Sequence, residues 1–215
     1  MLVKYKVSVY EKIMASRIVA ILRKIDVGKV KEIARALLEG GIYAMEVTMD
    51  TPGALEAIQM IKSDLGDNAA VGAGTVLDAE TGRLALLSGA EFLVAPNLNV
   101  DVIRLGNRYG RLVIPGCATP SEIETAYEAG ADIIKLFPAA DLGPGYIKNV
   151  KGPLGHITVM ATGGVGIENA DAFFAAGADI LGVGGRMINK EAIARGDFQV
   201  IADYAAQLVA KGKGL

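Results

Sequence analysis

The sequence predicts a (β/α)₈ TIM barrel, an α/β fold, from a fourfold pattern of glycines and from the number of strands that this pattern accommodates. In each of four segments a helical run ends at glycine and a strand follows. These segments are GIYAMEVT from Gly41, GAEFLVAP from Gly89, GADIIKLF from Gly130 and GADILGVG from Gly177. Their spacings of 48 (41 to 89), 41 (89 to 130) and 47 residues (130 to 177) each accommodate two βα units.

The sequence between these segments supplies four more strands and the helices. The further apolar runs are RIVAILR (17–23), AAVGAGTV (69–76), RLVIPGC (111–117) and ITVMATGG (157–164). Helical patterns include VGKVKEIARALLEGG, ETGRLALLSGA, PSEIETAYEAGA and ENADAFFAAGA. A doubly wound open sheet is the alternative. The even spacing, with no long connection where the strand order would reverse, favours the barrel.

Length and composition suggest one domain over residues 1–215, with residues 1–16 as an N-terminal helical segment that closes the barrel floor. The chain has 215 residues and 52% hydrophobic content, which suits one large core. Its formal net charge of −2 argues against a nucleic-acid or acidic membrane surface. No apolar stretch approaches the roughly 20 residues that cross a bilayer, and nothing resembles a secretory signal. The cytoplasm is the expected compartment.

The chain has few cysteine and histidine residues that could bind a transition metal. Cys117 is the only cysteine and His156 the only histidine, so we expect neither a disulfide nor a transition-metal site, and no cofactor. We expect Cys117 to be a small packed residue rather than a nucleophile. Ser-His-Asp chemistry would have to use His156, which lies in the loop-like stretch GPLGHIT.

Lys135 is the most unusual residue of the chain. It lies in ADIIKLFPAA (131–140), an apolar run that predicts a buried strand, where an unpaired ammonium is costly. If the glycine-anchored strands are the second, fourth, sixth and eighth, the fifth residue after each glycine belongs to one interior layer. This layer contains Glu46, Val94, Lys135 and Gly182. The next layer, toward the catalytic end of such barrels, contains Thr48, Pro96, Phe137 and Gly184.

A facing lysine and glutamate allow two interpretations. One is a buried ion pair that only fills the core. The other is catalysis: burial disfavours the ammonium form of Lys135, and a neutral amine can attack a carbonyl to form a Schiff base. Glu46 could then transfer protons at the carbinolamine and at the α-carbon. The second interpretation suits cleavage of a carbon–carbon bond beside a ketone, and we favour it.

Two glycine-rich stretches follow the seventh and eighth strands, ATGGVG (161–166) and GVGGRM (182–187). Loops in these places often bind phosphate in barrels, because glycine lets backbone N–H groups approach the anion. Arg186 could add a fixed charge. Arg23 and Thr75 end the first and third strands and could contact a substrate carboxylate or oxygen, or could equally face solvent.

A series of short stretches occurs in a specific order and spacing between about residues 18 and 185. These are VAILR, EGGIYAMEVT, VGAGTVLDAE, GAEFLVAPN, IPGCATPSE, IKLFPA, KGP and TGGV. Together they resemble a known family, the class I 2-keto-3-deoxy-6-phosphogluconate (KDPG) / 4-hydroxy-2-oxoglutarate (KHG) aldolases. The resemblance implies a metal-independent, homotrimeric barrel that splits KDPG into pyruvate and glyceraldehyde 3-phosphate, and 4-hydroxy-2-oxoglutarate into pyruvate and glyoxylate. The partner it implies is therefore a small keto acid.

The resemblance also implies roles for single residues. Lys135 would form the Schiff base and Glu46 would be the general acid/base. The remaining expected contacts are Arg23 at the substrate carboxylate, Thr75, Pro96 and Phe137 at the pyruvate end, and Gly163, Gly164 and Gly184 at the phosphate end. Gly185 and Arg186 stand near the place where many members carry a serine for the phosphate.

Two further departures concern Asp50, where some members carry arginine, and Ala161, where members often carry proline. They leave open an aldolase for the galactonate epimer of the same keto acid. Outside the class, the alternatives are a phosphosugar isomerase or epimerase without a covalent intermediate and a non-catalytic binding protein.

Overall fold

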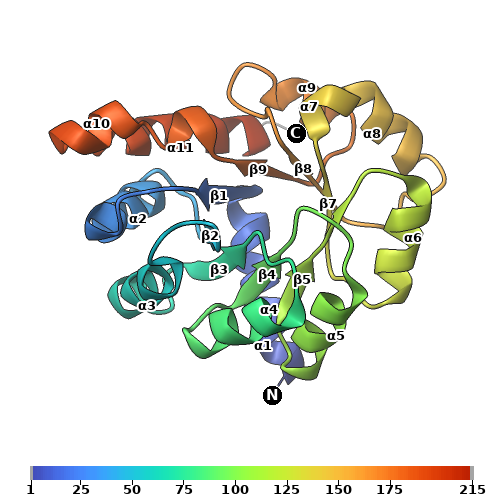
Figure 1. The fold of residues 1–215 in the computed structure, drawn as a ribbon. Helices are drawn as coiled ribbons and strands as arrows, with labels where there is room; N and C mark the ends of the chain where they lie inside the picture. The colour runs from blue at the N-terminus through green and yellow to red at the C-terminus, as the bar shows by residue number, and fades with distance from the viewer. Residues whose placement is uncertain (1, 214–215) are drawn as a thin grey trace.

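The computed structural model describes residues 2–213, and at residues 2–4 their backbone alone. In this part of the chain, nine strands run parallel in one sheet, in the order β5-β4-β3-β2-β1-β9-β8-β7-β6, with helices around them (Figure 1). The strands are β1 (Ile18–Leu22), β2 (Ala44–Thr48), β3 (Ala70–Gly74), β4 (Phe92–Val94), β5 (Leu112–Ile114), β6 (Gly116–Cys117), β7 (Ile134–Leu136), β8 (Val159–Thr162) and β9 (Ile180–Val183).

The two ends of this strand order are consecutive pieces of one segment. β5 pairs with β4, β6 pairs with β7, and Pro115 separates the two pieces. Proline has no N–H to donate to a neighbouring strand, so the ladder is interrupted there. If β5 and β6 are counted as one interrupted strand, the sheet closes into a barrel of eight strands. This confirms the predicted barrel and rules out the doubly wound open sheet.

The strands begin later than the glycine pattern suggested. Gly41, Gly89, Gly130 and Gly177 each have positive φ, at 84°, 102°, 91° and 101°. They end the preceding helices in a backbone conformation that glycine adopts without steric cost. The strands start three or four residues further on, so the repeat is real, but its first residues belong to the turn.

The helices alternate with the strands and lie outside them (Figure 1). They are α1 (Leu2–Ser16), η1 (Val27–Lys29), α2 (Val30–Glu39), α3 (Ala54–Leu65), α4 (Ala79–Leu87), α5 (Val100–Arg108), α6 (Pro120–Glu128), α7 (Ala139–Leu142), α8 (Pro144–Lys151), α9 (Ala170–Ala175), η2 (Gly185–Met187), α10 (Lys190–Arg195) and α11 (Gln199–Lys213). Among residues 2–213, no helix combines the length and apolar character that crossing a membrane requires.

The lower half of the barrel interior is filled by apolar side chains. Val9 and Ile13 of α1 belong to the same buried cluster as Phe92 of β4, Met160 of β8 and Ile133, which directly precedes β7. Alternate residues of a strand point to the same face, so Phe92 and Ile133 lie one layer below Val94 and Lys135. The apolar face of α1 therefore closes one end of the barrel, and the cavity lies at the carboxyl ends of the strands.

A repeated polar contact fixes the amino ends of the strands. The acidic residue two places after Gly89, Gly130 and Gly177 accepts a backbone N–H from the preceding strand and pairs with a lysine. The three sets are Glu91 with Val71 N (3.1 Å) and Lys62 (3.1 Å), Asp132 with Val113 N (3.1 Å) and Lys6 (2.8 Å), and Asp179 with Val159 N (2.8 Å) and Lys151 (2.9 Å). Because each acid joins two neighbouring strands, the contact fixes their register.

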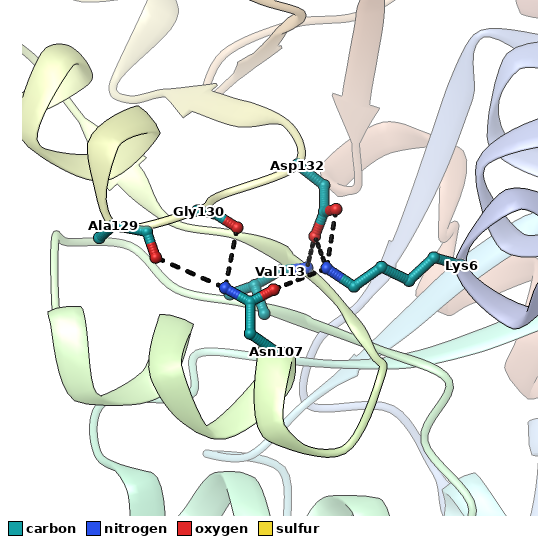
Figure 2. A network of polar contacts seen from close by, with 6 residues as sticks. All are labelled: Lys6, Asn107, Val113, Ala129, Gly130 and Asp132. Carbon is teal, nitrogen blue, oxygen red and sulfur yellow. Dashed lines mark hydrogen bonds and ion pairs between the residues drawn. The ribbon is translucent and has the colours of Figure 1, made fainter. Parts of the chain in front are cut away.

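Figure 2 shows the set that also anchors α1. The Lys6 ammonium donates to both oxygens of Asp132 and to Asn107 Oδ1, at 2.7–2.8 Å. The Asn107 amide in turn donates to the Gly130 carbonyl at 3.0 Å. The helix that closes the barrel is thus tied to α5 and to the segment that leads into β7, the strand that carries Lys135.

Candidate active site

A cavity of about 780 Å³ opens at the carboxyl ends of the strands. It contains ten of the eleven side chains or glycines that the sequence singled out. These are Arg23, Glu46, Pro96, Lys135, Phe137, Gly163, Gly164, Gly184, Gly185 and Arg186. Residues in or directly after β1, β2, β4, β7, β8 and β9 therefore meet in one place, as the carboxyl ends of parallel barrel strands do.

Thr75 is the exception, because it is not among the residues that line the cavity. Its hydroxyl oxygen accepts a hydrogen bond of 2.9 Å from Arg23 Nη2. In the structure Thr75 thus contacts Arg23, a residue that does line the cavity, and its direct contact with a substrate stays a prediction.

Lys135 lies in the middle of β7 with 6% of its surface exposed. Its neighbours Ile134 and Leu136 point away from the barrel axis and are buried in the outer core. The ammonium nitrogen lies 5.1 Å from the centre of the Phe137 ring. Burial lowers the pKa of Lys135 below its usual value, the charge of Glu46 opposes this shift, and the charge of Arg23 adds to it. The site therefore favours the neutral, nucleophilic amine.

Glu46 occupies the corresponding place on β2, with 1% of its surface exposed. Burial raises the pKa of its carboxyl group, and the charges of Lys135 and Arg23 partly offset the increase. Within the described residues, Oε2 has no hydrogen-bond partner. A pair that only filled the core would satisfy its buried oxygens, so the free Oε2 favours the catalytic interpretation over the ion pair.

Thr162 belongs to the cavity and was missed at the sequence level. It ends β8, is 3% exposed, and its Oγ1 is the other buried side-chain atom without a partner in the part of the chain that the structure describes. Gly182 on β9 leaves room for it, since an added Cβ would lie 2.3 Å from that oxygen. The sequence did contain an indication of this position. Thr162 lies two residues after Met160 on the same strand, so both side chains point into the barrel, and Thr162 is the last strand residue before the glycine pair.

The two glycine-rich loops form the outer wall of the cavity. Gly163 and Gly164 have φ of 97° and 69°, and an added Cβ on Gly164 would lie 2.4 Å from the Cβ of Ala140. Asn169 accepts from Gly166 N and donates to the Gly164 carbonyl, both at 2.9 Å. These glycines are therefore required by the shape of the loop, and Asn169 holds that shape.

Arg186 crosses from one loop to the other. Its guanidinium donates to the Glu168 carboxylate, and both side chains are exposed at the mouth of the cavity. Hydrogen bonding to its own backbone N–H and the nearby Arg186 charge hold the pKa of Glu168 below its usual value. The charge expected from Arg186 is thus present, with a carboxylate as its partner.

Residues able to hold a metal do not gather here. Among residues 5–213, no three His, Cys, Asp or Glu side chains form a group that could hold a metal ion. Cys117 is buried, and burial raises the pKa of its thiol to about 12, so it packs as a small apolar residue at neutral pH.

A desolvated lysine amine and a buried carboxylate in one cavity, at the open end of a (β/α)₈ barrel, are the groups that a class I aldolase uses, the class that works through a lysine Schiff base. The chain belongs to the KDPG and KHG aldolase family, whose model matches residues 9–204.

Individual relatives agree with this assignment. The 2-dehydro-3-deoxy-6-phosphogalactonate aldolase of Escherichia coli (strain K12) is 39% identical over 168 residues, which are 78% of this chain and 82% of the relative. The 2-dehydro-3-deoxy-phosphogluconate aldolase of Treponema pallidum (strain Nichols) is 34% identical over 203 residues, 94% of this chain and 96% of the relative.

Solved structures show the same fold. A native KDPGal structure has a TM-score of 0.85 and 36% identity, covering 90% of this chain and 93% of the other. The KDPG aldolase of Legionella pneumophila, with pyruvate captured as a covalent carbinolamine intermediate, has a TM-score of 0.85 and 26% identity, covering 92% and 96%.

Proposed function

We propose that this aldolase cleaves 2-keto-3-deoxy-6-phosphogluconate to pyruvate and glyceraldehyde 3-phosphate, and also 4-hydroxy-2-oxoglutarate to pyruvate and glyoxylate. The observation that carries the proposal is the pair Lys135 and Glu46, buried in one cavity with the pKa of the amine lowered and the pKa of the acid raised. Opposite shifts of this kind are typical of an acid/base pair that works near neutral pH.

The reaction begins when the neutral Lys135 amine attacks the C2 ketone. Glu46, whose pKa is raised, protonates the carbinolamine hydroxyl, which leaves as water, and the resulting protonated Schiff base withdraws electrons from the C3–C4 bond. Glu46 takes the proton of the C4 hydroxyl as this bond breaks, and the aldehyde leaves. Glu46 then returns a proton to C3 of the enamine, and hydrolysis of the Schiff base releases pyruvate and restores the amine.

The remaining residues bind the rest of the substrate. Arg23 binds the carboxylate next to the ketone, and Pro96 and Phe137 enclose the pyruvate end together with Thr162. Gly163, Gly164, Gly184, Gly185 and Arg186 bind the phosphate at the outer wall, where backbone N–H groups can approach the anion.

The galactonate epimer is a second candidate substrate. It is supported by the 39% identity with the Escherichia coli phosphogalactonate aldolase and the 36% identity with the KDPGal structure. One hydroxyl distinguishes the two keto acids, and a single side chain can recognise it. Pyruvate release from the two epimers and from 4-hydroxy-2-oxoglutarate, compared as kcat/KM, decides between the substrates.

The Schiff base itself is tested with pyruvate and borohydride. Reduction should leave a pyruvate-derived adduct on Lys135 that mass spectrometry locates, and an unmodified lysine would exclude covalent catalysis. The phosphosugar isomerase or epimerase predicts that Lys135→Arg keeps appreciable activity. The aldolase predicts a nearly complete loss, since guanidinium is no nucleophile at neutral pH.

The proposal includes a homotrimer in the cytoplasm. Two apolar side chains of α4, Leu84 and Leu87, expose 53% and 64% of their surface, which is the kind of area that subunit contact covers. Sedimentation equilibrium of the purified chain tests the trimer, and Leu84→Glu together with Leu87→Glu tests whether this helix lies in the contact.

A further inference from the structure

The carboxyl ends of β1, β2 and β3 carry a polar network whose centre is Arg23. Arg23 Nη2 donates to Thr75 Oγ1 at 2.9 Å, and Arg23 Nε lies 3.9 Å from Asp50 Oδ1. Asp50 follows β2 and Thr75 follows β3, so the guanidinium that follows β1 is contacted by both neighbouring segments. Arg23 lines the cavity, whereas Asp50 and Thr75 do not.

The backbone around Arg23 is held in an unusual conformation. Lys24 and Thr75 have φ of 49° and 57°, and among residues 2–213 only one other non-glycine residue has positive φ. Such conformations cost free energy and persist where surrounding contacts fix them. Here the Lys24 N–H donates to Thr51 Oγ1 at 2.8 Å, and the Thr51 and Thr48 hydroxyl oxygens lie 3.1 Å apart and are buried. Lys24, which follows Arg23, and Thr75, which contacts it, thus both adopt strained backbone conformations next to the Arg23 side chain.

Asp50 is the acidic residue of this network. A hydrogen bond from the Thr48 hydroxyl, and then the Arg23 charge, hold the pKa of Asp50 below its usual value, so the carboxylate is ionised at neutral pH. Arg23 also acts on the pair within the cavity, because its charge lowers the pKa of both Glu46 and Lys135. The orientation of this one guanidinium therefore matters for binding and for proton transfer alike.

We propose that Asp50 is a positioning residue, which together with Thr75 fixes the Arg23 guanidinium at the edge of the cavity for the carboxylate of an α-keto acid. Asp50 approaches Nε and Thr75 approaches Nη2, so neither of them occupies Nη1, which is the donor that we assign to the ligand carboxylate. The site thus holds one cation, Arg23, together with its own counter-ion, Asp50. This inference rests on the proposed function of the site.

The test measures how Lys135 trapping by borohydride depends on pyruvate concentration. Asp50→Ala should raise the half-saturating pyruvate concentration about tenfold, which corresponds to the coupling energy typical of residues in one hydrogen-bond network. The trapping rate at saturating pyruvate should change by less than about threefold. Asp50→Glu, which keeps the charge, should recover part of this loss. Thr75→Val should raise the same concentration without touching the Asp50 charge. The matched control is Asp64→Ala, which removes the partner of Arg35 on the outer helices and should change nothing in this assay.

A double-mutant cycle shows whether Asp50 works through Arg23. Arg23→Ala should raise the half-saturating concentration, and adding Asp50→Ala to it should have no further effect. An additive double mutant, or an Asp50→Ala protein with wild-type half-saturation, would overturn the inference. Failure of the proposed function looks different, because Lys135 of the unmodified protein would then not be trapped at all. Thermal unfolding of each variant separates a loss of binding from a loss of fold.

Discussion

Gly74 lies against the carboxylate of Glu46, so closely that an added Cβ would be 2.4 Å from Oε1 and 2.7 Å from the carboxyl carbon. Gly72, in the same strand and the same phase, leaves similar room for the Phe92 ring, where an added Cβ would lie 2.4 Å from a ring carbon. Two glycines on the inner face of β3 therefore make space for the Glu46 carboxylate from β2 and for the Phe92 ring below it.

Gly74→Ala should displace the Glu46 carboxylate and lower kcat by about ten- to a hundredfold, because small misplacements of a catalytic group are costly. Pyruvate release measures the effect. Gly145→Ala is the matched control, since an added Cβ there meets nothing within 4 Å, and it should leave kcat unchanged. A Gly74→Ala protein with full activity would show that the carboxylate need not occupy its present place.

Glu46→Gln should shift the pH dependence of Lys135 trapping. The trapping rate rises with pH as the amine loses its proton, and burial places this rise below the ordinary value of 10.5. The Glu46 charge raises the pKa of Lys135, so its removal should move the rise to lower pH. Arg23 acts in the opposite sense, and Arg23→Gln should move the rise to higher pH. Shifts in the same direction for both variants would contradict this electrostatic account.

Asp132→Ala should destabilise the barrel and leave the chemistry intact. The change removes the acceptor of the Val113 N–H and the partner of Lys6, and an unsatisfied group of this kind costs about 1–3 kcal/mol. Urea denaturation measures the loss. Asp101→Ala removes only an exposed pair with Arg104 and should cost about 0–1 kcal/mol. An equal, small loss in both proteins would mean that the contact at the barrel floor is no stronger than a surface pair.

Glu168→Gln should improve the binding of phosphorylated substrates. The change frees Arg186 from its carboxylate partner, and exposed pairs of this kind are weak, so KM should fall about two- to fivefold. Arg186→Gln should raise KM for the same substrates. Neither change should affect 4-hydroxy-2-oxoglutarate, which has no phosphate, and an equal effect on that substrate would place Arg186 outside the phosphate end.

The sequence predicted the positions that depend on strand phase. Glu46 and Lys135 could be assigned to one layer because side chains alternate along a strand and the glycine repeat aligned the strands. The contacts of Arg23 could not be predicted in this way. They depend on the positive φ of Lys24 and Thr75, and lysine and threonine do not indicate such a backbone conformation in a sequence. Thr162 was missed because the ATGG stretch was interpreted through its glycines alone, as a loop that binds phosphate.

The apolar floor formed by α1 has a consequence for the order of product release. Lys135 lies directly above a layer that contains Ile133, Phe92 and side chains of α1, so nothing can leave downward. In the proposed reaction the three-carbon fragment is bound covalently to Lys135 at the bottom of the cavity, and the aldehyde fragment lies between it and solvent. The aldehyde must therefore depart first and pyruvate last, and pyruvate should act as the product that competes with the whole keto acid for the free enzyme.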